Sequence, residues 1–224
     1  MDGPDDSTAA TDTGSAGAPG ARPLSRREAN KADKRRRIVA AGRLLFRTEG
    51  FEATTAAAIA SAAGVGTGTF YLYASSKEEL LVEVFQADIE RAWGDAFALA
   101  PVDRPLAEQL TAVFGHVTRF HEGEPELARA FLKEVLFVSP AVRAGVNESM
   151  RFIFGGIANL LVRAQERGEL DPGITPFQLA RNLFYLWYPL QQLRHAGASS
   201  MAEAMEHFEA ALAVALRGML RPSG

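Results

Sequence analysis

Residues 54–73 read TTAAAIASAAGVGTGTFYLY, and this stretch decides the fold. Thr55 stands before a run of small residues and is a good N-cap, because its side-chain oxygen can accept a hydrogen bond from a free N–H group at a helix start. Gly64 interrupts the run, and a second short helical segment begins at Thr67. Two short helices joined by a tight glycine-containing turn are typical of a helix-turn-helix, whose second helix enters the major groove of DNA.

Charge is distributed unevenly around this stretch. Residues 22–80 contain 11 Lys and Arg against 6 Asp and Glu, whereas residues 81–224 contain 13 basic and 17 acidic residues. A basic segment in a chain of net charge −3 indicates a surface that binds a polyanion. The densest part of it contains Arg35, Arg36 and Arg37. A solvated helix start is the alternative interpretation of this basic run.

Composition excludes several classes of protein and site. The chain has 224 residues, of which 47% are hydrophobic and 23% charged, as in an ordinary soluble protein of one or two domains. The absence of cysteine excludes disulfides, thiolate zinc sites and a cysteine nucleophile. No metal or other cofactor is predicted, because the histidines lack the spacing of metal ligands: His116, His121, His195 and His207. Without a long apolar run or a secretory signal, we expect a cytoplasmic protein with no membrane partner.

Hydrophobic periodicity predicts an all-α chain in three parts. Residues 1–24 are expected to be a disordered tail, because they contain almost no large apolar residue. Residues 25–80 are expected to form a three-helix DNA-binding domain, joined by a long helix to a ligand-binding and dimerisation bundle in residues 81–224. The predicted helices span residues 27–48, 56–63, 67–73, 76–99, 104–121, 125–136, 141–168, 175–194 and 201–220.

The last two predicted helices indicate a homodimer. The helix over 175–194 is apolar on two sides and therefore needs two partners, and the helix over 201–220 has a bundle-like seam. Together they could form a four-helix interface across a two-fold axis. Packing within one chain is the competing explanation.

The N-terminal part resembles the DNA-binding domain of the tetracycline repressor (TetR) family. The resemblance rests on seventeen positions: Ile38, Ala41, Leu45, Phe46, Gly50, Phe51, Thr55, Ile59, Ala60, Gly64, Val65, Gly68, Thr69, Tyr71, Tyr73, Lys77 and Leu80. It implies an all-helical, homodimeric and ligand-responsive transcriptional regulator, usually a repressor, with a divergent C-terminal effector domain. Two positions depart from the family pattern: Gly66 stands where Ser is common, and Ala74 where an aromatic residue is common.

Candidate DNA contacts follow from side-chain chemistry. Hydroxyl and ammonium groups suit phosphate oxygens, and short or apolar side chains suit base edges and thymine methyl groups. We expect phosphate contacts from Thr55, Tyr71, Tyr73 and Lys77. Groove contacts are expected from Thr67, Thr69 and Phe70, and Gly66 belongs to the same DNA-binding surface. Arg35, Arg36 and Arg37 are expected to supply salt-sensitive attraction. Packing between helices is the alternative for Phe70, Tyr71 and Tyr73.

The C-terminal part is rich in aromatic residues, which predicts an apolar ligand pocket. Its expected lining is Phe114, Phe131, Phe152, Phe184, Trp187 and Tyr188, with Gln191, Asn159, His116 or Arg163 as polar contacts. Ordinary core packing is the alternative for any one of these aromatic residues.

The function predicted from these patterns is a ligand-responsive repressor. It would bind double-stranded DNA at a near-palindromic operator as a homodimer, and a mostly apolar small molecule would release it. An enzyme is not expected: residues 64–68 lack the third glycine of a dinucleotide-binding loop, and no P-loop sequence occurs. The alternative is a helical ligand-binding or adaptor protein whose helix-turn-helix no longer reads a specific operator.

Overall fold

The computed structural model describes residues 25–220, and within that range the fold is all-helical. The fold class predicted from the sequence is confirmed. The helices are α1 (Arg26–Thr48), α2 (Ala56–Ala62), α3 (Thr67–Phe70), α4 (Lys77–Ala98), α5 (Leu106–Gly123), α6 (Pro125–Glu134), α7 (Pro140–Glu166), α8 (Pro176–His195) and α9 (Met201–Leu216). The only β pairing among the described residues is an isolated bridge between Leu170 and Leu220. The predicted tail over 1–24 lies outside the described residues.

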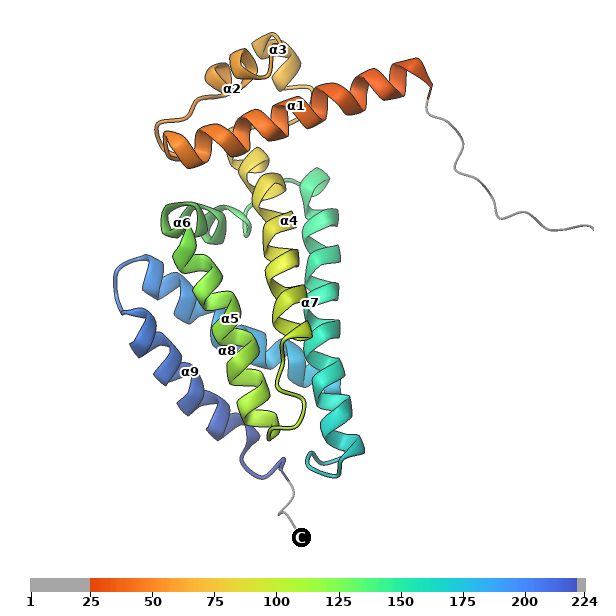
Figure 1. Ribbon diagram of the computed structural model, residues 1–224, viewed down its shortest axis with the longest axis vertical. Helices are drawn as coiled ribbons and strands as arrows, with labels where there is room; N and C mark the ends of the chain where they lie inside the picture. The colour runs from red at the N-terminus through yellow and green to blue at the C-terminus, as the bar shows by residue number, and fades with distance from the viewer. Residues whose placement is uncertain (1–24, 221–224) are drawn as a thin grey trace, which may run out of the picture.

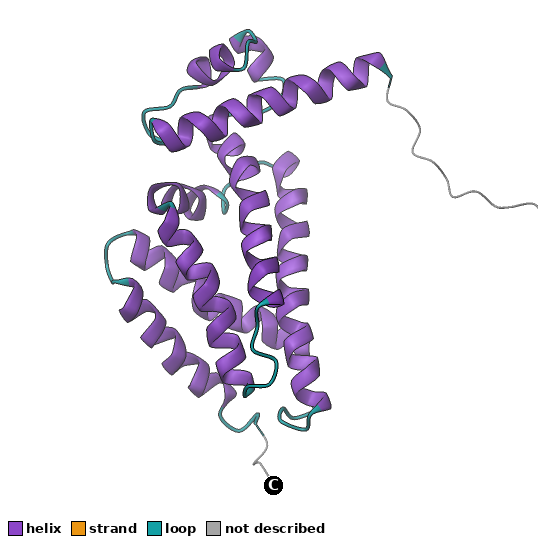
Figure 2. Ribbon diagram, viewed as in Figure 1, coloured by secondary structure: helices purple, strands orange, loops and turns teal. Residues whose placement is uncertain are grey.

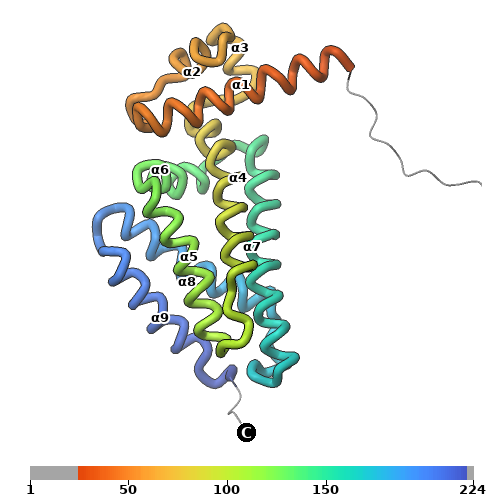
Figure 3. Tube along the Cα trace, in the orientation of Figure 1, coloured from red at the N-terminus to blue at the C-terminus, as the bar shows by residue number. Residues whose placement is uncertain are grey.

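The helices form two parts, which we call the head (α1 to α3) and the body (α4 to α9). Figure 1 shows α1 lying across one end of α4, with α2 and α3 on the far side of α1. The body is a bundle in which α4, α5, α7 and α8 surround a common interior, and α9 packs against α5 and α8 (Figure 3). Because α4 belongs to the bundle and also packs against α1, it connects the two parts.

Local sequence signals set the helix starts in the head. Ser25 and Glu28 form a capping box at the start of α1, and the Thr55 side chain accepts a hydrogen bond from the Ala58 N–H at the start of α2. Gly64 has a φ of 63°, which glycine adopts without the steric cost that other residues incur, so the chain can turn sharply before α3.

Two predicted helices end three or four residues earlier in the structure. The predicted recognition helix over 67–73 is α3, which ends at Phe70; Leu72 and Tyr73 continue in tight turns, because their N–H groups bond to carbonyls three residues back. The last predicted helix, over 201–220, ends at Leu216, shortly before Gly218 with its φ of 79°. In the part drawn as helix in Figure 2, no helix is both long and apolar enough to cross a bilayer.

The interior of the body is aromatic. Trp93 of α4 has ring contacts with Phe114 of α5 and with Trp187 of α8, at centroid distances of 5.4 and 5.6 Å. Phe208 of α9 closes the cluster, 4.7 Å from Phe114. Such tilted and edge-to-face pairs stabilise a core beyond the area that they bury.

Candidate nucleic-acid interface

The start of α3 is the exposed surface of the helix-turn-helix. Gly66, Thr67 and Gly68 are exposed, and a Cβ added at either glycine would meet no atom within 4 Å. Thr69 is half-buried and Tyr71 is 55% exposed. The short residues therefore leave the first turn of α3 open to a close approach by a large partner such as a DNA groove.

Phe70 is the position where the expected groove contact is wrong. Its side chain is fully buried beneath α3, where its ring meets that of Tyr71 edge-on at 5.3 Å. A buried ring cannot reach a thymine methyl group, so Phe70 holds α3 against the head. The structure therefore agrees with the alternative interpretation of Phe70, packing between helices.

Lys77 also has a structural role in place of the expected phosphate contact. Its Nζ donates to the carbonyl oxygens of Phe51, Glu52 and Thr54, at 2.9, 3.3 and 3.1 Å, and lies 4.4 Å from the centroid of the Phe51 ring. A lysine ammonium has three donors, and all three are used here. Lys77 therefore closes the α1–α2 connection onto the start of α4.

The remaining expected phosphate contacts lie at the surface to different degrees. Thr55 is exposed, and because its hydroxyl oxygen accepts the capping bond, its proton is available to an outside acceptor. Tyr73 is half-buried and packs against the head core.

The three arginines expected to attract DNA lie on the solvent side of α1. Arg36 and Arg37 pair with Asp33, at 2.9 and 3.3 Å, and Arg35 pairs with Glu83 of α4 at 2.8 Å. All three side chains remain at least 45% exposed, so water screens these pairs and the guanidinium groups stay accessible to a polyanion.

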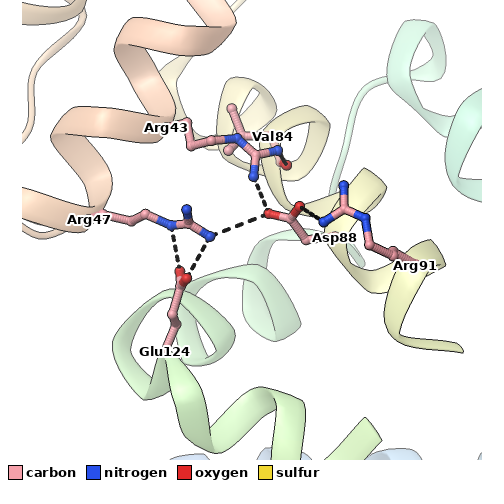
Figure 4. Close-up of polar contacts among 6 residues, drawn as sticks. All are labelled: Arg43, Arg47, Val84, Asp88, Arg91 and Glu124. Carbon is pink, nitrogen blue, oxygen red and sulfur yellow. Dashed lines mark hydrogen bonds and ion pairs between the residues drawn. The ribbon is translucent and has the colours of Figure 1, made fainter. Parts of the chain in front are cut away.

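A buried carboxylate ties the head to the body. Figure 4 shows Asp88 of α4 receiving Arg43 and Arg47 from α1 and Arg91 from its own helix, while Arg47 also binds Glu124 at the α5–α6 junction. We call these five residues the Asp88 cluster. Asp88 is 4% exposed, and the Arg43 guanidinium donates in addition to the Val84 carbonyl at 2.9 Å. The cluster therefore joins α1 to α4 and to the α5–α6 junction.

The residues expected to line a ligand pocket are mostly packed in the core of the body. Phe114 and Trp187 are fully buried with ring centroids 5.7 Å apart, and the Trp187 Nε1–H donates to Thr118 Oγ1 at 2.9 Å. Phe131 packs on Phe85. For these residues the structure has the contacts that core packing predicts.

The other three residues of that set range from buried to exposed. Phe184 stacks on Tyr188, whose hydroxyl donates to the Leu132 carbonyl at 2.8 Å; burial raises the pKa of Tyr188 to about 12. Phe152 is 46% exposed and lines a shallow hollow of about 390 Å³ beside Asn159 and Arg163, two of the expected polar contacts.

A larger cleft of about 1010 Å³ lies where the head meets the body. The α1–α2 connection, α6 and the end of α8 form its walls. Phe51, Leu132 and Phe137 contribute apolar surface, while Arg194 and His195 contribute polar groups. None of the six expected ligand-binding aromatic residues lines this cleft.

Sequence reasoning missed a group of polar side chains between α5 and α8. His121 is buried with its ring 5.8 Å from that of Trp187 and 5.9 Å from that of His195. Burial, with the neighbouring His195 and Arg194, lowers the pKa of His121 to about 3, and burial lowers the pKa of His195 to about 4. Both imidazoles are therefore neutral at pH 7. The spacing of the histidines in the sequence gave no signal, because they meet only when α5 and α8 pack together.

Known proteins are similar to this chain both in the head and over most of its length. Residues 38–84 match the sequence profile of the bacterial regulatory proteins of the tetR family. The chain is 29% identical to the HTH-type transcriptional repressor KstR of Rhodococcus jostii over 66% of its own length, and this match spans 65% of the repressor. It is 27% identical to the HTH-type transcriptional regulator UidR of Escherichia coli, over 83% of this chain and 90% of that protein.

A solved structure supports the same assignment across most of the chain. The TetR-family transcriptional repressor FadR of Thermus thermophilus, solved in complex with lauroyl-CoA, has a TM-score of 0.69 and 27% identity, covering 85% of this chain and 97% of FadR. The relatives named here are regulators of transcription and not enzymes. Residues 38–84 thus contain the DNA-binding domain of the tetR family of bacterial regulatory proteins, and the fold of most of the chain is similar to that of the TetR-family repressor FadR.

Proposed function

We propose that the protein is a ligand-responsive repressor that binds a near-palindromic operator as a homodimer. The observation that carries the proposal is the open first turn of α3, held on a head whose buried core includes Phe70. Two such heads related by a two-fold axis would place their α3 helices in successive major grooves, about one helical turn apart.

The DNA contacts are assigned from exposure. Thr67 and Thr69 are proposed to face base edges, next to Gly66, while Thr55, Tyr71 and Tyr73 are proposed to contact phosphates. Arg35, Arg36 and Arg37 would supply attraction that does not depend on sequence and weakens with salt. Phe70 and Lys77 are left out, because their side chains are occupied within the head.

The dimer is proposed to form through α8 and α9. Both helices leave large apolar side chains exposed: Phe177, Tyr185, Leu186, Leu193, Met201 and Val214. Pairing these surfaces across a two-fold axis would form a four-helix interface and remove the apolar groups from water. Because α8 and α9 pack against each other, the six side chains are proposed to form one continuous dimer interface.

The ligand is proposed to be a mostly apolar small molecule that binds in the body and weakens DNA binding. The lauroyl-CoA in the FadR structure of Thermus thermophilus supports an acyl compound or a molecule of similar shape. Because the Asp88 cluster fixes α1 to α4, a ligand that favours a tilted α4 would change the separation of the two heads. Such a switch requires that the ligand bind the two states with different affinity.

The test is selection of duplexes from a random DNA pool, followed by fluorescence anisotropy over a salt series. We expect a selected site with two related half-sites, binding by a dimer and a steep loss of affinity with salt. Thr67→Ala should lower affinity at one base position in each half-site, whereas Thr111→Ala, on α5 of the body, should not. Equal binding to selected and scrambled duplexes would favour the adaptor alternative and contradict the proposal.

A further inference from the structure

Two buried side chains on facing helices of the body have polar atoms without a partner among the described residues. Both ring nitrogens of His121 on α5 and the Nε2 of Gln191 on α8 make no hydrogen bond. His121 is 2% exposed and Gln191 is fully buried. Folded proteins pair nearly all buried polar atoms, because leaving one unpaired after removing it from water is costly.

The free atoms of this pair are mainly hydrogen-bond donors. The Oε1 of Gln191 already accepts from the Arg194 Nε at 3.3 Å, so what remains is its NH₂ group. The His121 imidazole is neutral, with its pKa lowered to about 3, and a neutral ring carries one N–H donor and one acceptor. The pair can therefore offer N–H groups to an oxygen atom.

The surroundings favour an uncharged oxygen. The Trp187 ring lies 5.8 Å from His121, and Trp187 precedes Gln191 by one turn on α8. Arg194, the cation that contacts Gln191, is paired with Glu122, so its charge is already compensated. A carboxylate that bound in this aromatic interior would lose its hydration shell and would find no unpaired cation beside Gln191, so its burial would be costly.

One wall of the cleft at the junction of head and body lies close to this pair. His195 lines the cleft, and its ring lies 5.9 Å from that of His121. Arg194 also lines the cleft, and its guanidinium donates to Gln191 in the interior. The cleft wall and the buried pair are thus one side chain apart.

We propose that His121 and Gln191 are the polar end of the effector site, and that they donate hydrogen bonds to a neutral carbonyl or ester oxygen of an otherwise apolar ligand that enters past His195. This rests on the proposed function for the role of the ligand as effector. It names the functional group that the site selects and the two residues that select it.

Binding of three probes of equal chain length tests the proposal: methyl decanoate, decanoate and decane. Tryptophan fluorescence reports occupancy, because Trp187 adjoins His121. We expect methyl decanoate to bind about tenfold more tightly than either other probe, which is the contribution of roughly one net hydrogen bond. His121→Phe and Gln191→Leu should each remove this preference for the ester and leave the affinity for decane unchanged.

Two variants separate hydrogen bonding from shape. Gln191→Glu keeps the size of the side chain but replaces the N–H donors by oxygen, so it should bind the ester as weakly as Gln191→Leu does. His207→Leu, on the exposed side of α9, is the matched control and should bind all three probes as the wild type does. The unfolding midpoint of His121→Phe should not fall, because it replaces unpaired buried polar atoms, whereas that of Gln191→Leu should fall slightly, because the Arg194 Nε loses its acceptor.

Three results are decisive. Unchanged ester binding in both His121→Phe and Gln191→Leu would overturn the proposal and assign the free atoms to internal water. Preference for decanoate would overturn it in favour of a carboxylate site. Operator binding, measured without any probe, stands apart: if it is absent while ester selectivity follows His121 and Gln191, the proposed function fails and the assignment of the pair stands.

Discussion

The head and the body differ in whether all of their buried polar side-chain atoms have hydrogen-bond partners. In the described part of the head, Thr54 Oγ1 donates to the Gly50 carbonyl at 2.7 Å, and Lys77 at the start of α4 donates to three head carbonyls. In the body, buried atoms of Gln109, His121, Ser139 and Gln191 have no partner among the described residues. In the described residues, the head thus has no buried side-chain polar atom without a partner, whereas the body has several that an outside group could satisfy. The difference suits a rigid DNA reader joined to a ligand sensor.

The contact between these two regions should give the largest effect. Asp88→Asn removes the carboxylate that two head arginines share, and leaves their charges beside Arg91. We expect the free energy of unfolding to fall by about 3 kcal/mol, since three arginines lose a carboxylate that is itself buried between them. Urea denaturation measures it. Glu108→Gln breaks the exposed Arg104 pair instead and should cost less than about 0.5 kcal/mol.

The Asp88 result also tests whether head and body unfold together. If Asp88→Asn and Glu108→Gln have the same free energy of unfolding, the Asp88 cluster does not hold the head and the body together. Two separate transitions for Asp88→Asn, in place of one, would show that the cluster alone makes unfolding cooperative.

The hydrogen bonds of Lys77 test whether this residue stabilises the head or contacts DNA. Lys77→Met should lower the free energy of unfolding by about 2 kcal/mol, because three carbonyls lose a charged donor. At temperatures where it is folded, its affinity for DNA should equal that of the wild type. Lys34→Met, at an exposed position of α1, should leave stability unchanged and lower the salt slope by about 1. A stable Lys77→Met that binds every duplex more weakly would restore the phosphate contact expected from the sequence.

The buried histidines give the body a pH dependence that the head lacks. His121 has a pKa near 6.5 when unfolded and about 3 when folded, so below pH 6.5 the unfolded chain binds a proton that the folded chain does not. Stability should therefore fall as pH drops. Between pH 7 and pH 5 we expect the wild type to lose about 2 kcal/mol more than His121→Phe, measured by urea denaturation. His195, Arg194 and Glu122 remain in both proteins, so equal losses would mean that His121 is protonated in the folded body.

Gly66 offers the smallest effect, at the DNA-reading surface itself. It is the N-cap of α3 with no side-chain capping bond, and its φ of −71° is accessible to any residue. Gly66→Ser adds a capping hydroxyl into open space and should stabilise the head by about 0.5 kcal/mol in thermal unfolding. Ser61→Ala on α2 serves as the control. A loss of stability in Gly66→Ser would show that the start of α3 needs the freedom of glycine.

Sequence reasoning succeeded where the determining signals are local. The Thr55 cap and the turn at Gly64 depend on neighbouring residues, so the helix-turn-helix was predicted with its order and spacing. Phe70 and Lys77 were misassigned because burial is decided by α1 and α4, which pack from elsewhere in the chain. A ring or an ammonium beside a recognition helix suits either a core or a DNA contact, and periodicity does not separate the two.

The site residues that were missed depend on long-range packing. Asp88 and Arg43 are 45 positions apart, and Arg47 and Glu124 are 77 apart. His121 becomes a neighbour of Trp187 only when α5 packs against α8, whereas Gln191 was among the polar contacts expected from the sequence. For His121 the signal that was present is compositional: a histidine stands among the apolar residues of an amphipathic helix. That pattern marks buried polar positions without saying what they bind.

The most direct test measures operator affinity for two proteins, the wild type and the double variant His121→Phe with Gln191→Leu, each with and without methyl decanoate. Without the ester, the account predicts equal affinity, because the head is complete in itself. With the ester, the wild type should release the operator and the double variant should remain bound. Release of both proteins to the same extent, or loss of operator binding by the double variant alone without ester, would contradict the division between a self-contained reader and a sensing body.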